Sequence, residues 1–376
     1  MPLQKKIAIL GGGQLGQMFI QNAISYGVDI AVLDPSENCS CAGLATSYTK
    51  GSFKDYDTVL AFGRQADIIT IEIEHVNTDA LFQLEKEGKT VIPSVRAIEI
   101  IKDKGLQKEF YATHNIPSSD FVLVENAEEI EKHQDKFPFF QKARKEGYDG
   151  KGVVKLKDET SLKNAFDCPS VLESLVDIEK ELSVIVVRSQ SGEMQVFPVV
   201  ELVFDPVYNL VDYLKIPAEI DDSQLQEAND LAMKVVDALD SAGVFAVELF
   251  LTKEGKILVN ETAPRAHNSG HHTIEASISS QFDQQLRVLL DLPIGSTKSY
   301  KAAAMINVVG SEGYTGKAKY EGVDEILSLD NVYLHLYGKE ETRPGRKMGH
   351  ATVIGFSAEE IKPKIEAVKE KLKVIS

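Results

Sequence analysis

Cysteine is scarce in this chain of 376 residues, which has only Cys39, Cys41 and Cys168. An odd number of cysteines, two of them spaced C-x-C, fits neither a disulfide framework nor a zinc knuckle. We therefore expect a reduced, cytoplasmic protein. The sequence also lacks a run of about 18 apolar residues, so we expect no membrane span. The apolar part of MPLQKKIAIL is too short for a signal peptide and predicts a first strand.

Positive charge is in the minority. Lys and Arg number 41 against 57 Asp and Glu, which gives a net charge of −16. This balance argues against a broad surface for nucleic acid or anionic membranes, but it is compatible with a local basic pocket for a phosphorylated small molecule. The apolar content of 43% and the length are ordinary for a globular protein of two or three domains.

The order of predicted elements changes along the chain. Over residues 1–95, strands at KKIAIL, DIAVLDP, ADIITIEIEHV and TVIP alternate with helices, which predicts an open parallel sheet. After a helix near 95–113, apolar runs follow one another with little helix between them, which predicts mostly antiparallel sheet. A long amphipathic helix at about 221–241 precedes the strands VFAVELFLT and KILVNET. The segment from about 300 predicts further strands and a final helix.

The stretch GGGQLG satisfies the dinucleotide pattern G-x-G-x-x-G through Gly11, Gly13 and Gly16. Asp34 ends the second predicted strand, about where a ribose-binding acid belongs. One interpretation is an NAD-dependent oxidoreductase. The other is a sharp strand-to-helix turn that serves a different anion.

A second glycine-rich stretch, QKARKEGYDGKG, lies between two predicted strands, with Lys142 and Lys151 on either side of its glycines. Exposed backbone N–H groups and lysines suit a triphosphate. The alternative is a plain β-hairpin with a D-G turn. It is not a Walker A loop, because no G-K-[ST] opens a helix.

Glutamates interrupt several apolar runs. Glu173 and Glu181 border two successive predicted strands, where they could bind a nucleotide or lie at the surface. Glu248 and Glu261 lie on adjacent predicted strands, with Asn260 beside the second. Such a pair makes an oxygen site for Mg²⁺ shared with phosphates, unless each acid is paired to a lysine.

Two polar stretches carry the remaining candidates. In RAHNSGHH, His267 and His271 have i, i+4 spacing, but Ser and Gly between them disfavour a helical zinc site. Arg265 and His267 are better placed to bind an anion. The basic stretch YGKEETRPGRKMGH predicts either a solvated face or a pocket for a monophosphate.

Four features resemble those of the ATP-grasp superfamily. In order along the chain, they are the stretch EGYDGKG, the spacing E-x₇-E-L, the predicted strand that carries Glu248, and the stretch NETAPRAHNSGH. With GGGQLGQM and YGK…GRKMGH, nearly the whole chain resembles the N5-carboxyaminoimidazole ribonucleotide synthetase family. The resemblance implies an α/β and α+β protein. It would have a Rossmann-like (pre-ATP-grasp) domain at 1–95, an ATP-grasp domain at 96–298 with a lid at about 115–185, and a small β-rich C-terminal domain at 299–376.

The resemblance also implies a reaction of purine biosynthesis. ATP phosphorylates bicarbonate to carboxyphosphate, which releases CO₂ beside 5-aminoimidazole ribonucleotide, and the 5-amino group attacks it. The implied cofactors are ATP and Mg²⁺, and the implied assembly is a homodimer with a functional link to the mutase that takes the product. A formyl-transferring glycinamide ribonucleotide enzyme is the nearest alternative, but a glutamate is expected there in place of Gln14.

The resemblance assigns residues to each ligand. Mg²⁺ would be held by Glu248 and Glu261, and bicarbonate or carboxyphosphate by Arg265 and His267. Asp149 would accept the proton of the amine, Lys102 competes with Lys104 for the phosphates, and His271 and His272 have structural roles. ATP would be bound by Lys104, Lys142, Gly147, Tyr148, Asp149, Gly150, Lys151, Gly152, Glu173, Ser174, Leu175, Val176, Glu181, Asn260 and Glu261. The ribonucleotide would be bound by Gln14, Leu15, Glu74, Tyr148, Asp149, Asn268, Lys339 and Arg346.

Overall fold

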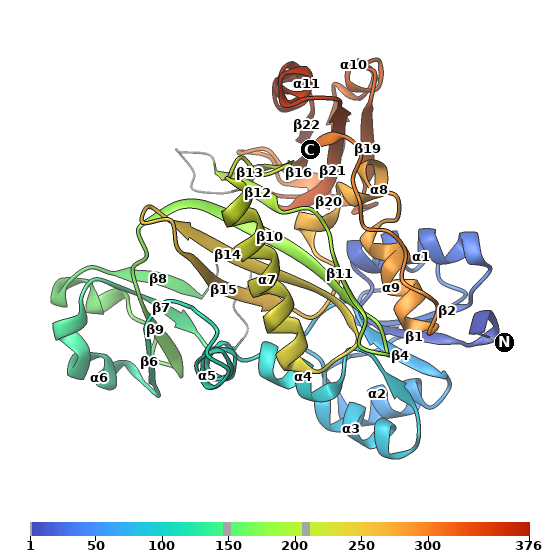
Figure 1. Ribbon diagram of the computed structural model, residues 1–376. Helices are drawn as coiled ribbons and strands as arrows, with labels where there is room; N and C mark the ends of the chain where they lie inside the picture. Colours follow the sequence, from blue (N-terminus) through green and yellow to red (C-terminus); the bar gives the residue numbers. More distant parts are fainter. Residues whose placement is uncertain (1, 146–151, 205–210) are drawn as a thin grey trace.

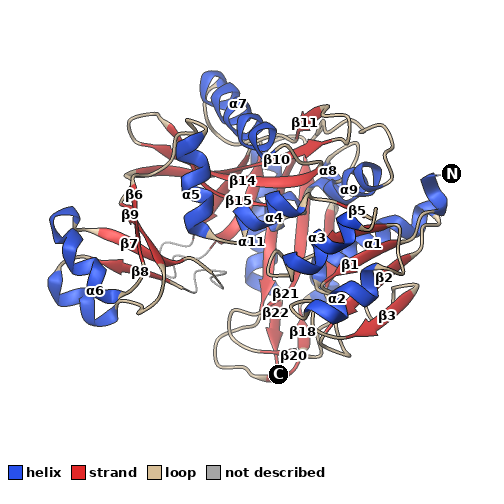
Figure 2. Cartoon of the chain, turned by 90° about the horizontal axis from the view of Figure 1, so that it is seen from below, coloured by secondary structure: helices blue, strands red, loops and turns tan. Residues whose placement is uncertain are grey.

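The computed structural model describes residues 2–145, 152–204 and 211–376. A sheet near the middle of the chain lies centrally, and a smaller sheet projects to one side of it (Figures 1 and 2). The N-terminal elements pack below and to the right of the central sheet, and the C-terminal elements lie above it in Figure 1.

The N-terminal part forms a parallel sheet in the order β3-β2-β1-β4-β5, as the sequence predicts. Strands β1 and β4 at its centre are buried on both faces, which explains their continuous apolar runs, whereas β3 at one edge is largely exposed. Helix α1 ends at Gly27, whose φ of 64° is left-handed. The elements are η1 (Pro2–Gln4), β1 (Ile7–Leu10), α1 (Gln14–Tyr26), β2 (Ile30–Asp34), β3 (Ser47–Lys50), α2 (Tyr56–Gly63), β4 (Ile68–Ile71), α3 (Thr78–Lys86), β5 (Thr90–Val91) and α4 (Val95–Ile101).

The projecting sheet is antiparallel, in the order β6-β9-β7-β8, and we call it the outlying sheet. Helix α5 precedes it and lies between it and the rest of the molecule (Figure 2). The elements are α5 (Lys104–Thr113), β6 (Phe121–Val124), α6 (Ala127–Ile130), η2 (Glu131–Lys136), β7 (Phe139–Ala143), β8 (Val153–Leu156), η3 (Glu159–Asn164) and β9 (Ser170–Ser174).

The central sheet runs in the order β15-β14-β10-β12-β13-β16-β21-β19, with β11 paired to β10. It continues from the middle of the chain into the C-terminal part, because β13 pairs with β16. Helix α7 covers one face of it (Figure 1). The elements are β10 (Ile178–Arg188), β11 (Met194–Val196), β12 (Val200–Phe204), β13 (Val211–Ile216), α7 (Asp222–Leu239), β14 (Gly243–Thr252), β15 (Ile257–Ala263), β16 (Ala302–Val309), β19 (Val332–Leu336) and β21 (Lys347–Gly355).

Smaller elements join these parts. Helix α9 packs against α1, and α11 packs against β16 and β21. In the part of the chain that the structure describes, no helix is both long and apolar enough to cross a membrane. The elements are η4 (Asn268–Gly270), α8 (Thr273–Ala276), α9 (Gln281–Leu289), β17 (Gly316–Lys317), β18 (Lys319–Glu321), α10 (Val323–Leu327), β20 (Glu341–Thr342), α11 (Ala358–Lys371) and β22 (Lys373–Ile375).

Two predicted elements differ in extent from those observed. The single helix expected near 95–113 is wrong, because α4 ends at Ile101 and α5 begins at Lys104. Asp103 separates the helices by capping the first N–H groups of α5. The strand expected at 67–76 ends at Ile71, so Glu72 and Glu74 lie just past the carboxyl end of β4.

Candidate active site

Two glutamates from neighbouring strands form the centre of the site. Glu248 on β14 and Glu261 on β15 are direct cross-strand partners. Burial and the charge of Glu261 raise the pKa of Glu248, whereas Lys104 lowers the pKa of Glu261. The Lys104 ammonium lies 2.5 Å from Oε2 of Glu261, so a cation already occupies a place beside this pair of carboxyl groups.

Two lysines reach this centre from different elements. Lys104 comes from the first turn of α5, and Lys142 comes from β7. The Lys142 ammonium donates to Oδ1 of Asn260 at 3.1 Å and lies 3.1 Å from Oε1 of Glu173. Lys102 points elsewhere, because its ammonium donates to the hydroxyl of Thr78 at 2.6 Å. The structure thus places Lys104, and not Lys102, beside the glutamates.

The donor set fits Mg²⁺ better than zinc. Among the described residues, no group of three or more His, Cys, Asp and Glu side chains could hold a metal ion. Structural zinc sites need four such ligands, and catalytic ones need three. Mg²⁺ commonly takes one or two carboxylates and completes its shell with water and phosphate oxygens. Glu248 and Glu261 supply that number of carboxylates.

Behind Lys142 lies a buried charge network that the sequence did not reveal. Glu173 is 4% exposed and Lys108 is 2% exposed. The Glu173 carboxylate accepts from the hydroxyl of Ser119 at 2.9 Å and lies 3.3 Å from the Lys108 ammonium. Burial opposes ionisation, but Lys142 and Lys108 lower the pKa of Glu173 below its ordinary value. The only sequence signal was the i, i+4 spacing of Lys104 and Lys108 on α5.

The predicted adenine linker, Glu173 to Val176, joins the outlying sheet to β10. The backbone N–H of Ser174, at the end of β9, donates to the carbonyl of Asp120 at 2.9 Å. This bond links the two segments by which the chain enters and leaves the outlying sheet. Glu181 lies on β10, where burial raises its pKa to about 7 while Lys142 opposes the shift. Both features lie on the side of the glutamate pair toward the outlying sheet.

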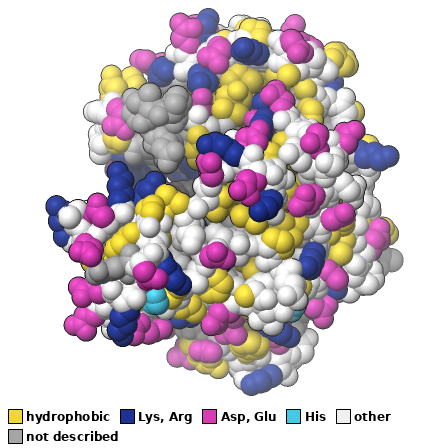
Figure 3. Space-filling model, turned by 60° about the vertical axis from the view of Figure 1, so that its left-hand side comes forward, with side chains coloured by type: hydrophobic (Ala, Val, Ile, Leu, Met, Phe, Trp, Pro, Cys, Tyr) yellow, Lys and Arg dark blue, Asp and Glu magenta, His cyan; other side chains and the backbone are white. Residues whose placement is uncertain are grey.

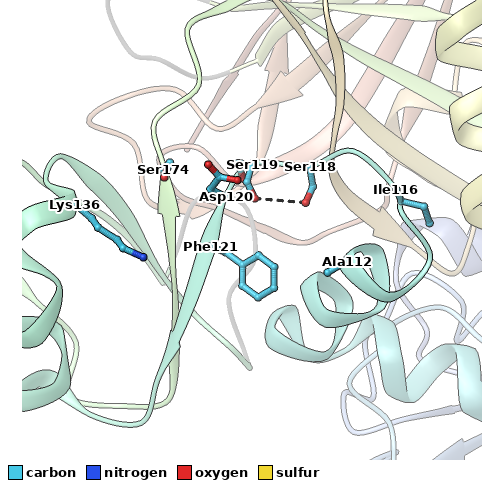
Figure 4. A pocket seen from close by; sticks show the side chains of 8 residues that line it. All are labelled: Ala112, Ile116, Ser118, Ser119, Asp120, Phe121, Lys136 and Ser174. Carbon is cyan, nitrogen blue, oxygen red and sulfur yellow. Dashed lines mark hydrogen bonds between the residues drawn. The ribbon is translucent and has the colours of Figure 1, made fainter.

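A cavity of about 650 Å³ lies where these two segments enter and leave the outlying sheet. Figure 4 shows Phe121 between Lys136 of the outlying sheet and Ala112 of α5. Of the predicted ATP residues, Ser174 lines this cavity, whereas the glutamate pair does not. The cavity is lined by Ala112, Ile116, Ser118, Ser119, Asp120, Phe121, Lys136 and Ser174.

On the other side of the glutamates lies the predicted anion site. The Arg265 guanidinium donates through Nε to Oε2 of Glu74 at 2.7 Å, across 191 residues of sequence. Burial alone would raise the pKa of Glu74, but the charge and hydrogen bonds of Arg265 lower that pKa to about 2. His267 lies with Nε2 3.7 Å from Oε1 of Glu248. Burial and Arg265 lower the pKa of His267 to about 4, so this imidazole is neutral at pH 7.

The glycine loop before α1 is filled by the protein's own carboxylates. The backbone N–H of Gly12 donates to Oδ2 of Asp34 at 2.8 Å, and that of Leu15 donates to Oε1 of Glu72 at 3.3 Å. A side chain in place of Gly13 would collide with the Glu72 carboxylate. A dinucleotide phosphate would need these same N–H groups. This arrangement disfavours NAD, although the pattern of glycines permits it.

Glu72 is a site residue that the sequence prediction missed. Burial raises its pKa to about 7. It alternates with Glu74 directly after β4, and carboxyl ends of parallel strands are where ligands bind in such sheets. The alternation of Glu72 and Glu74 at the end of a predicted parallel strand could therefore have identified Glu72 from the sequence.

The basic C-terminal loop comes close to α1. The side chain of Gln17 donates to the carbonyl of Leu336 at 3.5 Å, and Ser40 donates to the carbonyl of Tyr337 at 2.8 Å. The Lys339 ammonium donates to the carbonyl of Lys347 at 2.7 Å and lies 5.4 Å from the centre of the Tyr337 ring. These bonds bring the start of the basic loop beside α1 and the segment that follows β2. Figure 3 shows a hollow in which Lys and Arg side chains gather.

Other predicted residues take supporting positions. Arg346 donates to the carbonyl of Glu341 at 2.6 Å, and Asn268 begins η4 directly after His267. His271 is buried and lies 4.7 Å from the His350 ring, and His272 bonds the carbonyl of Ser269 at 2.9 Å. Gly152 closes the base of the second glycine loop, because its carbonyl accepts from the N–H of Ala143. Outside the described residues lie Gly147, Tyr148, Asp149, Gly150 and Lys151.

Comparison with known proteins identifies the family. Residues 4–102 match the ribonucleotide synthetase preATP-grasp domain, 109–282 the ATP-grasp domain, and 303–364 the phosphoribosylaminoimidazole carboxylase C-terminal domain. The crystal structure of N5-carboxyaminoimidazole ribonucleotide synthetase from Thermotoga maritima is 42% identical, with a TM-score of 0.91 over 99% of this chain and 100% of that one. The chain belongs to the N5-carboxyaminoimidazole ribonucleotide synthetase family. The family and the three-part fold class expected from the sequence are confirmed.

Other members of the family differ in length. The N5-carboxyaminoimidazole ribonucleotide synthase of Brucella melitensis is 36% identical over 93% of this chain and 96% of its own. The chloroplastic phosphoribosylaminoimidazole carboxylase of Vigna aconitifolia is 37% identical over 97% of this chain, but the match spans 66% of its length. A synthase structure from Aspergillus clavatus with ADP and 5-aminoimidazole ribonucleotide is 33% identical, with a TM-score of 0.88 over 98% of this chain and 100% of that one.

Proposed function

We propose that this protein of the N5-carboxyaminoimidazole ribonucleotide synthetase family is an ATP-dependent ligase. It carboxylates 5-aminoimidazole ribonucleotide with bicarbonate and releases ADP and phosphate, as a step of purine biosynthesis. The observation that carries this proposal is one continuous site. The glutamate pair with its two lysines borders Arg265 and His267. Lys347 of the basic loop lies near enough to act on both sides of the site, because its charge opposes the burial that raises the pKa of Glu248 and adds to the burial that lowers the pKa of His267.

On the nucleotide side, Glu248 and Glu261 hold Mg²⁺, which when bound neutralises charge on the phosphate oxygens. Lys104 and Lys142 add positive charge at the same place. The linker Glu173 to Val176 receives adenine, and Glu181 binds the ribose hydroxyls. The loop from Gly147 to Gly152 covers the phosphates.

On the acceptor side, Arg265 and His267 bind bicarbonate and then carboxyphosphate. A neutral His267 donates or accepts one hydrogen bond without adding charge, while Arg265 supplies the charge. Carboxyphosphate breaks its bond to phosphate and leaves CO₂, and the 5-amino group attacks that carbon and loses a proton to Asp149. Lys339 and Arg346 bind the phosphate of the ribonucleotide, and the rest of it contacts Gln14, Leu15, Glu74, Tyr148 and Asn268.

The assembly and the cellular setting are part of the same proposal. The protein acts in the cytoplasm as a homodimer, and its labile product passes to a mutase. Its domains are residues 1–95, 96–298 with the lid at about 115–185, and 299–376. The continuous β13–β16 pairing means that the last two share one sheet.

Release of ADP in the presence of bicarbonate should rise at least about tenfold when 5-aminoimidazole ribonucleotide is added, because the ribonucleotide completes the site in which charge is stabilised. A coupled ADP assay measures this. Activity only with formate and glycinamide ribonucleotide would refute the assigned substrate. In a thermal-shift assay, stabilisation by NAD⁺ and not by ATP with Mg²⁺ would favour an oxidoreductase.

Lys104→Met should weaken binding of ADP–Mg²⁺ by about tenfold or more, because one charge-assisted contact to phosphate is lost. Lys102→Met is the matched control, since that ammonium bonds Thr78 and should leave the affinity unchanged. Isothermal titration calorimetry with ADP and Mg²⁺ measures both variants. Equal losses of affinity for ADP–Mg²⁺ in the two variants would show that Lys104 makes no specific contact with the nucleotide.

A further inference from the structure

The start of α5 is held by an unusually well-bonded carboxylate. Asp103 is 3% exposed and caps the helix, with Oδ1 accepting from the N–H groups of Gly105 at 2.9 Å and Leu106 at 3.2 Å. A capping side chain that accepts two N–H groups needs no further partner to stabilise a helix end. Yet both oxygens of this carboxylate also bind Arg144.

Arg144 approaches Asp103 as a fork. Its Nε donates to Oδ1 at 2.8 Å and its Nη2 donates to Oδ2 at 3.1 Å. The backbone joins in, because the N–H of Lys104 donates to the carbonyl of Arg144 at 2.9 Å. Three bonds thus fasten the residue that follows β7 to the first turn of α5. Paired bonds of this kind fix orientation as well as distance.

The contact is so close that a side chain in place of Gly105 would displace Arg144. A Cβ on Gly105 would lie 2.6 Å from Nε of Arg144. The side chain of Arg144 is 20% exposed and that of Asp103 is 5% exposed, so water competes little for this pair. The burial makes the fork far more rigid than a surface ion pair.

Each partner is the neighbour of a lysine of the active site. Asp103 directly precedes Lys104. Arg144 lies two residues after Lys142, directly past the end of β7. The two lysines meet at adjacent residues of β15, Lys104 at Glu261 and Lys142 at Asn260. The fork is therefore one of the contacts that set α5 and β7 relative to each other near both lysines, together with the ion pairs of Lys108 and Lys142 with Glu173.

We propose that Asp103 and Arg144 are positioning residues for nucleotide binding, which hold the Lys104 and Lys142 ammonium groups in one arrangement around the ATP phosphates. The inference rests on the proposed function, in which both lysines contact those phosphates. Neither positioning residue touches the nucleotide. Their effect reaches it through the two lysines.

Arg144→Lys tests this inference, because it keeps the charge but removes the fork. The dissociation constant of ADP–Mg²⁺ and the KM for ATP should rise roughly tenfold, a loss equal to one displaced phosphate contact. The KM for 5-aminoimidazole ribonucleotide should stay within about twofold, because most of the residues assigned to it, among them Gln14, Glu74 and Lys339, lie on other parts of the chain. Asp103→Asn keeps a capping oxygen and should give the same pattern.

Arg64 provides the matched control. Its Nε and Nη2 bind Glu87 at 2.8 and 2.6 Å in a fork of the same bonding pattern, but more exposed and on other elements. Arg64→Lys should leave the KM for ATP unchanged. An unchanged KM for ATP in Arg144→Lys, or equal rises for both substrates, would overturn the inference.

A second step shows whether Arg144 acts through Lys104. In a Lys104→Met background, adding Arg144→Lys should weaken ADP–Mg²⁺ binding less than it does alone, since one of the two positioned groups is already gone. Full additivity would assign Arg144 a merely structural role. If Lys104→Met alone leaves the affinity unchanged, the assigned phosphate contact is wrong and the inference falls with it. If only Arg144→Lys has no effect, the proposed function stands and the inference is wrong.

Discussion

Glu261→Gln should lower the rate of ribonucleotide-stimulated ADP release by about a thousandfold, while the protein stays folded. The substitution removes one of two carboxylates available to Mg²⁺, and it also removes the partner of the Lys104 ammonium. A thousandfold loss corresponds to about 4 kcal/mol of transition-state stabilisation, which is the scale of a metal ion's contribution to phosphoryl transfer. Steady-state kcat at saturating ATP, Mg²⁺ and ribonucleotide measures it.

The fold should survive because glutamine keeps the shape of the side chain, and Asn260 and Thr262 on either side are unchanged. Circular dichroism and the urea midpoint should match those of the parent protein. Glu254→Gln is a suitable control, since Glu254 lies in the turn of the same β14–β15 hairpin and pairs with exposed Lys256 at 2.8 Å. Parent-like turnover in Glu261→Gln would remove this residue from the metal site.

That these two glutamates lie on adjacent strands could be predicted because the contact is local. A short turn joins β14 to β15, and a register shift between Glu248 and Leu249 then brings Glu248 opposite Glu261, which the turn alone does not predict. Residues thirteen apart across this turn were expected on adjacent strands, and the structure makes them direct partners. The N-terminal parallel sheet was predictable for a similar reason, since each buried strand and its following helix carry their own pattern.

Contacts between distant segments left little trace in the sequence. Arg265 and Glu74 are 191 residues apart, and nothing in either local pattern indicates their pairing. The glycine pattern before α1 permitted NAD, and only the positions of the Glu72 and Asp34 carboxylates argue against it. A pattern of glycines records the space around a backbone, but not which anion fills it.

The sequence could not decide between Lys102 and Lys104, because the choice depends on a helix break of two residues. Predicted helix boundaries are uncertain by at least that much. Both lysines were expected inside one helix, where they would point in different directions. The observed break at Asp103 puts Lys104 in the first turn of α5 and turns Lys102 toward Thr78. The Asp103 side chain caps α5 and thereby fixes the residue at which the helix begins. Helix ends are defined only to within one or two residues.

Glu173→Gln should destabilise the folded protein by about 3–5 kcal/mol, because it leaves buried Lys108 and Lys142 without their counter-charge. Lys108 is almost fully buried, and burial already lowers its pKa. The free energy of the first unfolding transition in urea measures the loss. Glu179→Gln, at an exposed position of β10, is the control and should change stability by less than about 0.5 kcal/mol.

Two further measurements separate loss of charge pairing from loss of packing. Glu173→Gln with Lys108→Met should recover part of the stability, because the uncompensated buried charge is gone. The pKa of Glu173 is lowered in the folded protein, so its stabilisation is present above the ordinary glutamate pKa of about 4.3 and is lost as the pH falls through the lowered value. The difference in stability between the parent protein and Glu173→Gln should therefore shrink as the pH falls below the ordinary glutamate pKa of about 4.3. A difference that does not shrink as the pH falls would mean that packing, and not charge, accounts for the effect.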